Sequence, residues 1–337
     1  MILVTGGTGL VGSHLLYKLV KKHDFVRATF RRQHKIKAVR HVFSYYSEEA
    51  ETLFKKIEWV EANLNDIPKL TLAFKDITQV YHCAAMVSFD PNDYHQLRQI
   101  NITGTANIVN LCLSHNITKL CYVSSIAAIG NEDDTSNITE SVPWNPEENH
   151  SVYAITKYGA EIEVWRGIHE GLNAVIVNPG MIIGPGFWRS SSGVLIRTIH
   201  KGLKYFTTGI TGYVDIFDVV DCMTILMASD IQNERFILIS DNLSFKSFVE
   251  KVAKHLQVNP PKKEAKHWQL QLAWRMDWLR HLLLRKRRRL TRNTVKSIST
   301  KQYYNNSKIK NALNFEFRLI DKSIKETCDH YINDLKD

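Results

Sequence analysis

A glycine-rich turn near the start of the chain is the strongest constraint on its fold. The segment TGGTGLVG, residues 5–12, follows an apolar run at residues 1–4 and precedes an amphipathic stretch at residues 15–20. A strand, a glycine turn and a helix start in this order let backbone N–H groups and a helix dipole hold a dinucleotide pyrophosphate. The three glycines permit, in turn, a tight bend, a close approach of phosphates and close packing of the helix: Gly6, Gly9 and Gly12. The turn predicts a dinucleotide site, although alone it would also suit an ordinary strand-to-helix loop.

A tyrosine and a lysine four residues apart form a second candidate site. Residues 152–165 are rich in Ala, Ile, Glu and Lys and contain one glycine and no proline, so a helix is predicted there. On a helix, Tyr153 and Lys157 share one face. Free tyrosine titrates at about pH 10, and a neighbouring ammonium favours its ionised form. The pair is therefore a candidate proton donor and acceptor, although this spacing also occurs by chance on many helices.

Strand-like apolar runs alternate with helical stretches such as Leu97–Leu113 over the first half of the chain. This alternation predicts an α/β fold, a doubly wound parallel sheet with helices on both faces. Ligands collect at the carboxyl ends of the strands in such sheets. The predicted strands are Met1–Val4, Val26–Phe30, Ile57–Val60, Gln79–Cys83, Lys119–Val123 and Ala174–Val177.

Beyond residue 179 the pattern becomes less regular. We expect a strand at YVDIF, residues 213–217, and a helix that begins with Asp218 as its N-cap. A short strand at Phe236–Ile239 and a helix near Phe245–Leu256 follow.

Six segments in chain order carry a resemblance to a known family. They are TGGTGLVG at 5–12, NLND at 63–66, HCAA at 82–85, SSIAAIG at 124–130, YAITK at 153–157 and NPGMIIGPG at 178–186. The set resembles the extended branch of the short-chain dehydrogenase/reductase superfamily, the NAD-dependent epimerase/dehydratase family. Two positions depart from its sugar-nucleotide members: Asn178 stands where many have arginine, and Ile129 where many have tyrosine.

The resemblance implies a Rossmann-like nucleotide-binding domain and a smaller α/β substrate domain. We expect residues 1–178 and 212–229 in the first, and residues 179–211 and 230–337 in the second. The second domain would lie over the crevice.

The resemblance also implies hydride transfer between a nicotinamide and a carbonyl or alcohol. Tyr153 would exchange the proton. Lys157 would bond the nicotinamide ribose and, with the cofactor's positive ring, lower the tyrosine pKa. Ser125 would hold the substrate oxygen, with Ser124 as the fallback. Asn101 is expected near the cofactor, although an asparagine there could be only a turn or cap residue. The expected cofactor-binding residues are Gly6, Gly9, Leu10, Val11, Gly12, Arg31, Arg32, Asn63, Leu64, Ala84, Ala85, Asn101, Tyr153, Lys157, Pro179 and Ile182.

Two arginines after the second strand bear on the choice of cofactor. A chain that prefers NAD commonly has an acid there to bind the ribose hydroxyls, whereas this chain has Arg31 and Arg32. The guanidinium fork suits a 2′-phosphate, so NADP(H) is favoured and NAD(H) is the alternative. The competing interpretation is that both arginines lie on a solvated edge.

Three functions fit the sequence. The favoured one is a reductase of a ketone or aldehyde on a fairly apolar small molecule, because VRATFRR and SSIAAIG resemble dihydroflavonol reductases and 3β-hydroxysteroid dehydrogenases. The second is a nucleotide-sugar epimerase or dehydratase, which returns the hydride to its own substrate. The third is an NADP-binding sensor without turnover, against which the retention of Ser125, Tyr153 and Lys157 counts.

A tryptophan- and leucine-rich segment precedes a basic run near the C-terminus. On a helical wheel, residues 268–284 carry two apolar stripes, and six of the eight residues at 285–292 are Lys or Arg, in a chain of formal net charge +10. Peripheral contact of Trp268–Arg292 with a membrane is one interpretation, and a solvated charge run is the other. No recognition motif accompanies the basic run, so nucleic-acid binding is not expected. The helices at Leu97–Leu113 and Val152–Gly167 could pair in a homodimer.

Composition favours a reducing compartment. The five cysteines lack CxxC spacing, and the fourteen histidines show no metal-ligand pattern, so neither disulfides nor a metal is expected. No secretory leader or membrane-spanning run is evident in the sequence. We therefore expect a cytoplasmic enzyme, at the inner face of a membrane if the basic segment binds lipid.

Overall fold

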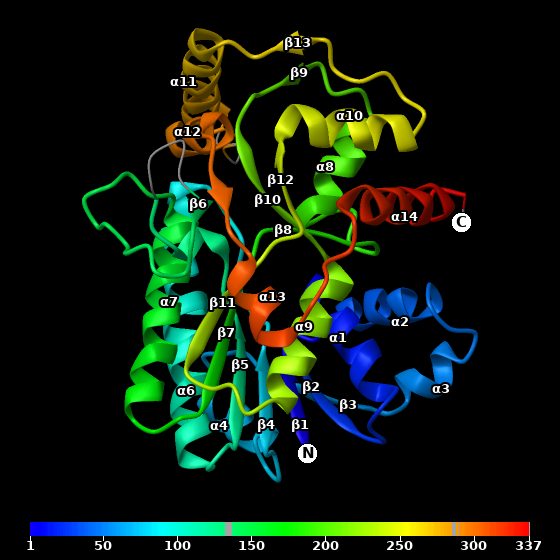
Figure 1. The fold of residues 1–337 in the computed structure, drawn as a ribbon, viewed down its shortest axis with the longest axis vertical. Helices are drawn as coiled ribbons and strands as arrows, with labels where there is room; N and C mark the ends of the chain where they lie inside the picture. The colour runs from blue at the N-terminus through cyan, green and yellow to red at the C-terminus, as the bar shows by residue number, and fades with distance from the viewer. Residues whose placement is uncertain (132–136, 285–287, 289, 337) are drawn as a thin grey trace.

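Seven parallel strands form the central sheet of the protein (Figure 1). The computed structural model describes residues 1–131, 137–284, 288 and 290–336. The strand order is β11-β7-β5-β4-β1-β2-β3, so the predicted doubly wound parallel sheet is confirmed. The strands are β1 (Ile2–Thr5), β2 (Val26–Phe30), β3 (Ile57–Glu61), β4 (Gln79–His82), β5 (Lys119–Val123), β7 (Ala174–Pro179) and β11 (Glu234–Leu238).

Helices cover both faces of this sheet, which is why its central strands are buried along nearly their whole length. One face packs against α1 (Leu10–Val20), α2 (Ile36–Ser44), α3 (Ala50–Phe54) and α9 (Ile216–Ala228). The other face packs against α4 (Ile67–Ala73), α6 (Gly104–Ser114) and α7 (Val152–His169).

The helix expected at Leu97–Leu113 is interrupted. A short α5 (Tyr94–Leu97) leads into a π-helical turn at Arg98–Thr103 and then into α6. This π-helical turn places the Asn101 side chain against the loop after β4. Such π-turns are frequent at functional sites.

A second, three-stranded sheet lies above the first in Figure 1 and has the order β12-β10-β8. Its strands are β8 (Met181–Ile183), β10 (Ile210–Asp215) and β12 (Asp241–Ser244), and the helices packed with them are α8 (Ser191–His200), α10 (Phe245–His255) and α14 (Ile320–Asn333). This arrangement corrects the expected division of the chain. β11 pairs with β7 in the large sheet although residues 230–337 were assigned to the substrate domain, and β10 lies in the small sheet although residues from 212 were assigned to the nucleotide-binding domain.

Shorter elements complete the chain. β6 (Asn137–Ile138) pairs with β14 (Tyr303–Tyr304), and β9 (Tyr205–Phe206) pairs with β13 (Lys263–Glu264). The remaining elements are α11 (His267–Leu284), α12 (Arg292–Ser299), α13 (Ser307–Leu313) and 3₁₀ turns at Gln33–Lys35, Pro91–Asp93 and Ile126–Ala128. None of the helices in the described part of the chain is long and apolar enough to cross a bilayer.

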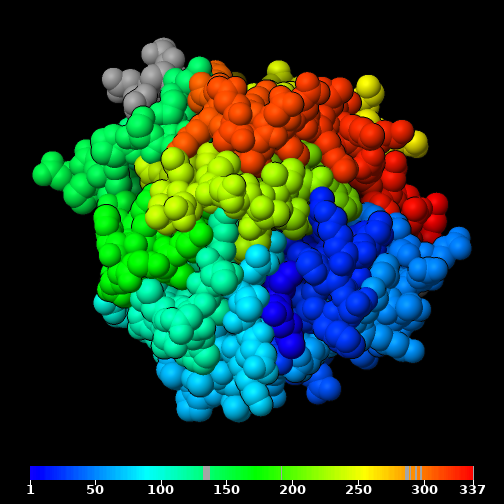
Figure 2. Space-filling view, turned by 60° about the horizontal axis from the view of Figure 1, so that its bottom comes forward, coloured from blue at the N-terminus to red at the C-terminus, as the bar shows by residue number. Residues whose placement is uncertain are grey.

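The C-terminal helix contacts the N-terminal half of the chain. Figure 2 shows the red C-terminal residues beside the light-blue segment that contains α2. The Asp334 carboxylate accepts hydrogen bonds from His41 Nε2 at 3.0 Å, Trp188 Nε1 at 2.6 Å and the Tyr45 hydroxyl. One carboxylate thus joins α2, the loop before α8 and the end of α14.

The start of α9 differs from the expected one. Asp215, not Asp218, is the N-cap, and its side chain accepts the Phe217 N–H at 2.6 Å. Asp218 lies in the first turn and is buried, where it accepts the Arg318 N–H at 2.9 Å. The helix thus begins three residues earlier than predicted, and Asp218 binds Arg318 from its first turn.

Burial raises the pKa of Asp218 to about 7, against about 4 for an unfolded chain. The folded protein therefore binds more protons in this range, and stability from this group is lost as pH rises from about 4 to 7. We expect Asp218→Asn, which still offers an oxygen to Arg318, to flatten the fall of the unfolding free energy across this range. Urea unfolding at pH 4.5 and pH 7.5 measures the effect, on the order of 1.4 kcal/mol per pKa unit. The exposed Asp241→Asn is the control, and equal slopes for wild type and Asp218→Asn would contradict the prediction.

Candidate active site

The loops that follow four adjacent strands lie at the same edge of the central sheet. β1 and β4 are neighbours at the centre of the sheet, where the strand order reverses, and β5 and β7 follow on one side. A ligand crevice is expected at such a switch point. The glycine turn follows β1, Ala84 and Ala85 follow β4, and Ser125 follows β5. Pro179 is the last residue of β7, and Ile182 lies half-buried in β8.

The glycine turn has the geometry of a phosphate cradle. Gly6 has φ +70°, and a Cβ there would lie 2.6 Å from the Ala84 backbone, while a Cβ on Gly12 would lie 2.2 Å from the Gly6 carbonyl oxygen. Gly9 differs, because the contact given for its Cβ is an ordinary 3.4 Å to that same oxygen. Packing within the protein therefore does not require glycine at position 9. A glycine there would instead let a phosphate approach the backbone closely.

The start of α1 leaves donors for such a ligand. Gly9 is the N-cap, and no side chain in the described residues caps the helix. The first-turn N–H groups, including those of Leu10 and Val11, are the donors that an uncapped helix offers to phosphate oxygens. The side chains of Leu10 and Val11 pack against the core, so only their backbones are suited to contact the cofactor. These residues fit a dinucleotide pyrophosphate.

Of the residues expected at the adenosine end of the cofactor, some have exposed side chains and one is buried in the core. Arg31 and Arg32 directly follow β2, and both side chains are exposed. Asn63 is exposed after β3, and its Oδ1 accepts the Asn65 N–H at 3.4 Å. Leu64 turns its side chain into the core, and its carbonyl accepts Asn107 Nδ2 at 2.8 Å.

Asn101 has a different role from the one expected. Its Oδ1 accepts the Met86 N–H at 2.7 Å, and its Nδ2 donates to the Met86 carbonyl at 3.0 Å and to Thr156 Oγ1 at 3.2 Å. Both donors of the buried amide are thus used inside the protein. The Asn101 side chain thus fastens the loop after β4 to α7, and its assignment to the cofactor site stays a prediction.

Ser125 and Tyr153 come together at the crevice. Ser151 caps α7 by accepting the Ala154 N–H at 3.1 Å, which places Tyr153 in the first turn of the helix. The phenol lies beside Ser125, whose hydroxyl lowers the phenol's pKa and whose Oγ accepts the Ala127 N–H at 3.2 Å. The Phe89 ring packs against the Tyr153 ring at a centroid distance of 5.5 Å. A hydroxyl pair and an apolar surface thus face the same place.

Lys157 is buried and held by strand β5. Its Nζ donates to the Tyr122 hydroxyl and to the Val123 carbonyl, both at 2.8 Å. Burial lowers the pKa of Lys157 to about 7, although the negative charge of the nearby Glu161 carboxylate raises it. Burial also raises the pKa of Tyr153, while its hydrogen bond with Ser125 lowers it. The lowering of the tyrosine pKa that is expected from Lys157 together with the positively charged cofactor ring stays a prediction, and the protein's own groups leave the phenol protonated at neutral pH.

A buried carboxylate that the sequence did not predict binds several side chains next to the site. Glu161 is 1% exposed and accepts hydrogen bonds from Ser124 Oγ at 2.6 Å and Asn178 Nδ2 at 2.8 Å. Arg235 forms an ion pair with its other oxygen at 3.0 Å. The Ser124 hydroxyl is thus committed to Glu161, which removes it as the fallback for Ser125. Glu161 follows Lys157 by four residues, so its place on the same helix face was the available signal.

His82 of the HCAA segment is structural. Its ring nitrogens lie 2.6 Å from Thr5 Oγ1 and 3.0 Å from Thr105 Oγ1, which joins β1 through β4 to α6. Burial, aided by the Lys157 charge, lowers the pKa of His82 to about 3, so its ring is neutral. Thr105 also lies beside the Tyr122 hydroxyl, which accepts a hydrogen bond from Lys157. Buried polar groups therefore lie between the strand before the glycine turn and the lysine.

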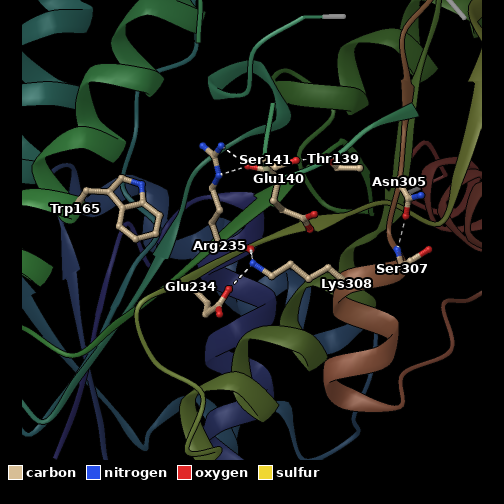
Figure 3. A pocket seen from close by; sticks show the side chains of 9 residues that line it. All are labelled: Thr139, Glu140, Ser141, Trp165, Glu234, Arg235, Asn305, Ser307 and Lys308. Atoms are coloured by element: carbon tan, nitrogen blue, oxygen red, sulfur yellow. Dashed lines mark hydrogen bonds and ion pairs between the residues drawn. The ribbon is translucent and has the colours of Figure 1, made fainter. Parts of the chain in front are cut away.

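A cavity of about 590 Å³ lies away from this crevice, beside β11 (Figure 3). Its basic groups have partners: Arg235 binds Glu161, which lies outside the lining, and the Glu140 carbonyl, and Lys308 binds Glu234 and the Arg235 carbonyl. These contacts fasten the segment after β6, and α13, to the edge of the large sheet. The lining residues are Thr139, Glu140, Ser141, Trp165, Glu234, Arg235, Asn305, Ser307 and Lys308.

The sequence and the fold of this chain are similar to those of known proteins. The family model of the NAD-dependent epimerase/dehydratase family matches residues 2–238. Sterol demethylase protein B of Methylococcus capsulatus is 29% identical over 245 residues, 71% of this chain and 70% of that protein. A putative dihydroflavonol 4-reductase of Synechocystis is 28% identical over 281 residues, 80% of this chain and 77% of that protein. The crystal structure of gox2253 shares the fold, with a TM-score of 0.82, 23% identity and coverage of 99% of this chain and 98% of its own.

The hydrogen bond between Lys157 and Tyr122 generates a stability prediction. Tyr122→Phe deprives the buried ammonium of one acceptor and should lower the free energy of unfolding at pH 6 by about 1–3 kcal/mol. At pH 9 the folded-state amine is neutral, because its pKa is about 7, so the loss should be smaller. Urea unfolding at both pH values measures this difference. The control is Tyr213→Phe, an equally buried tyrosine that stacks on Phe248. A loss of the same size at both pH values would contradict the assigned contact.

Proposed function

The chain belongs to the NAD-dependent epimerase/dehydratase family and is an NAD(P)-dependent oxidoreductase of the extended short-chain dehydrogenase/reductase type, and we propose that it reduces a ketone or aldehyde on a fairly apolar molecule with NADPH. The single observation that carries this proposal is the pairing of the Tyr153 phenol with Ser125 at the carboxyl end of β5. The reverse reaction is oxidation of the corresponding alcohol.

The protonation states support the direction of reduction. The bound nicotinamide supplies the hydride. A free phenol has a pKa of about 10 and burial raises the pKa of Tyr153 further, so at neutral pH the side chain carries the proton that it would give to a carbonyl oxygen. Ser125 offers a second hydroxyl to the same oxygen and keeps it within reach of the phenol. Proton transfer to an oxygen that is gaining negative charge accelerates such a step by roughly 10²–10⁴-fold.

Lys157 is suited to hold the nicotinamide ribose and to reprotonate the site. Its Nζ has two protein acceptors, so a third N–H of the ammonium remains to donate to a ribose hydroxyl. With a pKa of about 7, Lys157 can also release and regain a proton near neutral pH. Glu161 keeps a negative charge beneath the lysine and favours its charged form.

NADPH is the proposed reductant because of the charges after β2. Residues 25–47 contain no Asp or Glu, and Arg31 and Arg32 are exposed at the end of the strand. An acidic residue that would bind both ribose hydroxyls and repel a 2′-phosphate is thus missing from the sequence there. Guanidinium groups bind phosphate oxygens in pairs.

An apolar substrate is supported by the residues around the phenol. Phe89 packs on Tyr153, and Phe89 and Val87 are 47% and 57% exposed, respectively, in the loop after β4. Asn178, which replaces the family's frequent arginine, is buried and donates to the Ser125 carbonyl at 3.0 Å. It therefore supports the serine loop and is not available to a sugar nucleotide. The sterol and flavonol chemistry in the names of the two relatives agrees with this class of substrate.

Two other functions are separated from this one by net consumption of NADPH. A nucleotide-sugar epimerase or dehydratase returns the hydride to its substrate, and an NADP-binding sensor does not turn over.

The pairing of two chains through α6 and α7 stays a prediction. Ile155 and Ile162 of α7 are exposed apolar side chains that such pairing would cover.

Replacing the phenol tests the mechanism. Tyr153→Phe removes the proton donor and should lower kcat by at least about 100-fold for ketones and aldehydes that wild type reduces. The dissociation constant for NADPH should stay within about threefold, because the ring is retained. Nicotinamide absorbance measures turnover and fluorescence titration measures binding. The control is Tyr158→Phe, on the same helix, whose ring stacks on Trp144. Undiminished turnover in Tyr153→Phe would refute the mechanism.

Replacing the two arginines tests the cofactor choice. The double variant Arg31→Ala with Arg32→Ala should raise KM for NADPH by about 10–100-fold and change KM for NADH less than threefold, because only NADPH carries the 2′-phosphate. Initial rates with both cofactors give the comparison. Arg40→Ala, an exposed arginine on α2 paired with Glu51, is the control. Equal changes for both cofactors would assign the two arginines to a solvated edge.

A further inference from the structure

Helix α11 exposes a continuous apolar face. The side chains of Trp268, Leu272, Met276, Leu279 and Leu283 recur every three or four residues and are 48–70% exposed. Trp278 and Leu282 extend this face on one side. Isolated exposed apolar residues are ordinary on a protein surface, but a contiguous set of this kind marks a contact surface.

The opposite face of α11 is fixed to the protein. Leu270 is 9% exposed and Trp274 is half-buried. Asp277 pairs with Arg280 at 2.6 Å and accepts the Leu290 N–H at 3.1 Å, and α12 packs against α11. The Leu290 hydrogen bond, the buried Leu270 and the packing of α12 join this side of α11 to the rest of the chain, which leaves the other side exposed.

Positive charge is concentrated in the segment of the sequence that contains α11. Of the 44 Lys and Arg in the chain, twelve lie at residues 262–296, whereas only two of the 34 Asp and Glu do, so 32 of each sign remain elsewhere. This segment therefore carries the whole formal net charge of +10. Residues 285–287 and 289 of the expected basic run lie outside the described residues. The exposed basic residues that the structure places are Lys262, Lys263, Lys266, Arg275, Arg292 and Lys296.

We propose that the exposed face of α11 docks on an anionic lipid membrane, with its tryptophans and leucines among the acyl chains and its lysines and arginines on the headgroups. A helix with an apolar face and basic flanks lies in the plane of the interface, and its affinity rises with buried apolar area and with the negative charge of the lipid. The helix does not cross the membrane, in keeping with the finding for the described helices. Figure 1 shows α11 at the end of the molecule beyond the small sheet.

The net positive charge of residues 262–296 favours a lipid membrane, over a second copy of the chain or a nucleic acid, as the partner of the exposed α11 face. Two copies that met through α11 would bring two segments of charge +10 together, and like charges repel. A nucleic acid would match the charge, but its phosphates would leave the leucines and tryptophans uncovered. An anionic membrane satisfies both the apolar face and its basic surround.

Flotation of the full-length protein with vesicles tests the proposal. Wild type should float with phosphatidylcholine–phosphatidylglycerol vesicles (3:1) and at least about tenfold less with pure phosphatidylcholine. Leu272→Glu with Met276→Glu should reduce flotation at least about tenfold, because two charged groups replace buried apolar area. The matched control is Leu72→Glu, a 71% exposed leucine on α4, which should float like wild type.

A second pair of variants tests the electrostatic part. Lys263→Gln with Lys266→Gln removes two charges and should lower the partition coefficient about 25-fold, at about fivefold per charge. Lys22→Gln with Lys37→Gln, two exposed lysines far along the chain, should change it less than twofold. Unchanged circular-dichroism melting of each variant confirms that the fold is kept.

Three results would overturn the proposal. In the first, wild type stays at the bottom of the gradient with both vesicle types. In the second, the α11 variants float as well as wild type does. In the third, light scattering shows a dimer that Leu272→Glu with Met276→Glu converts to a monomer without any flotation of wild type, which would assign the face to a second copy.

Discussion

A polar and charged face of α7 is buried against the ends of β5 and β7, and the arrangement of the active site depends on every one of its groups having a partner. Lys157 is satisfied by Tyr122 and Val123, and Glu161 by Ser124, Asn178 and Arg235. An unpaired charge in such a place would be strongly destabilising, so the partners fix the rotation and depth of the helix. Tyr153 takes its place from that fixed helix.

The same burial sets the acid–base character of the site. It raises the pKa of Tyr153 and lowers the pKa of Lys157, which leaves a protonated phenol above a lysine that titrates near neutral pH. Desolvation disfavours whichever form is charged, so it moves an acid and a base in opposite directions. Reduction of a carbonyl requires a proton donor, and the half-buried Tyr153 phenol carries a proton at neutral pH.

Charge is distributed unevenly over the molecule, with a functional consequence. The nucleotide-binding sheet and its helices belong to a part of the chain in which positive and negative residues balance, whereas α11 and its flanks carry the excess. The two activities proposed for the chain thus occupy separate surfaces. A substrate that is apolar would be enriched where the apolar face of α11 lies, which connects the membrane contact to the carbonyl chemistry.

The sequence by itself determined the parallel sheet and the glycine turn. Strands β2 and β5 have their expected bounds, because local apolar runs and glycine spacing are local properties of the chain. It also placed Ser125, Tyr153 and Lys157 on elements whose ends converge. Only the tertiary structure decided which polar groups meet. The pairing of Glu161 with Arg235, the use of Asn101 inside the protein, the capping by Asp215 and the transfer of β11 to the large sheet all depend on residues distant in sequence. Desolvation is likewise a property of the packed core, so the direction of the Tyr153 pKa shift could not be inferred from its spacing to Lys157.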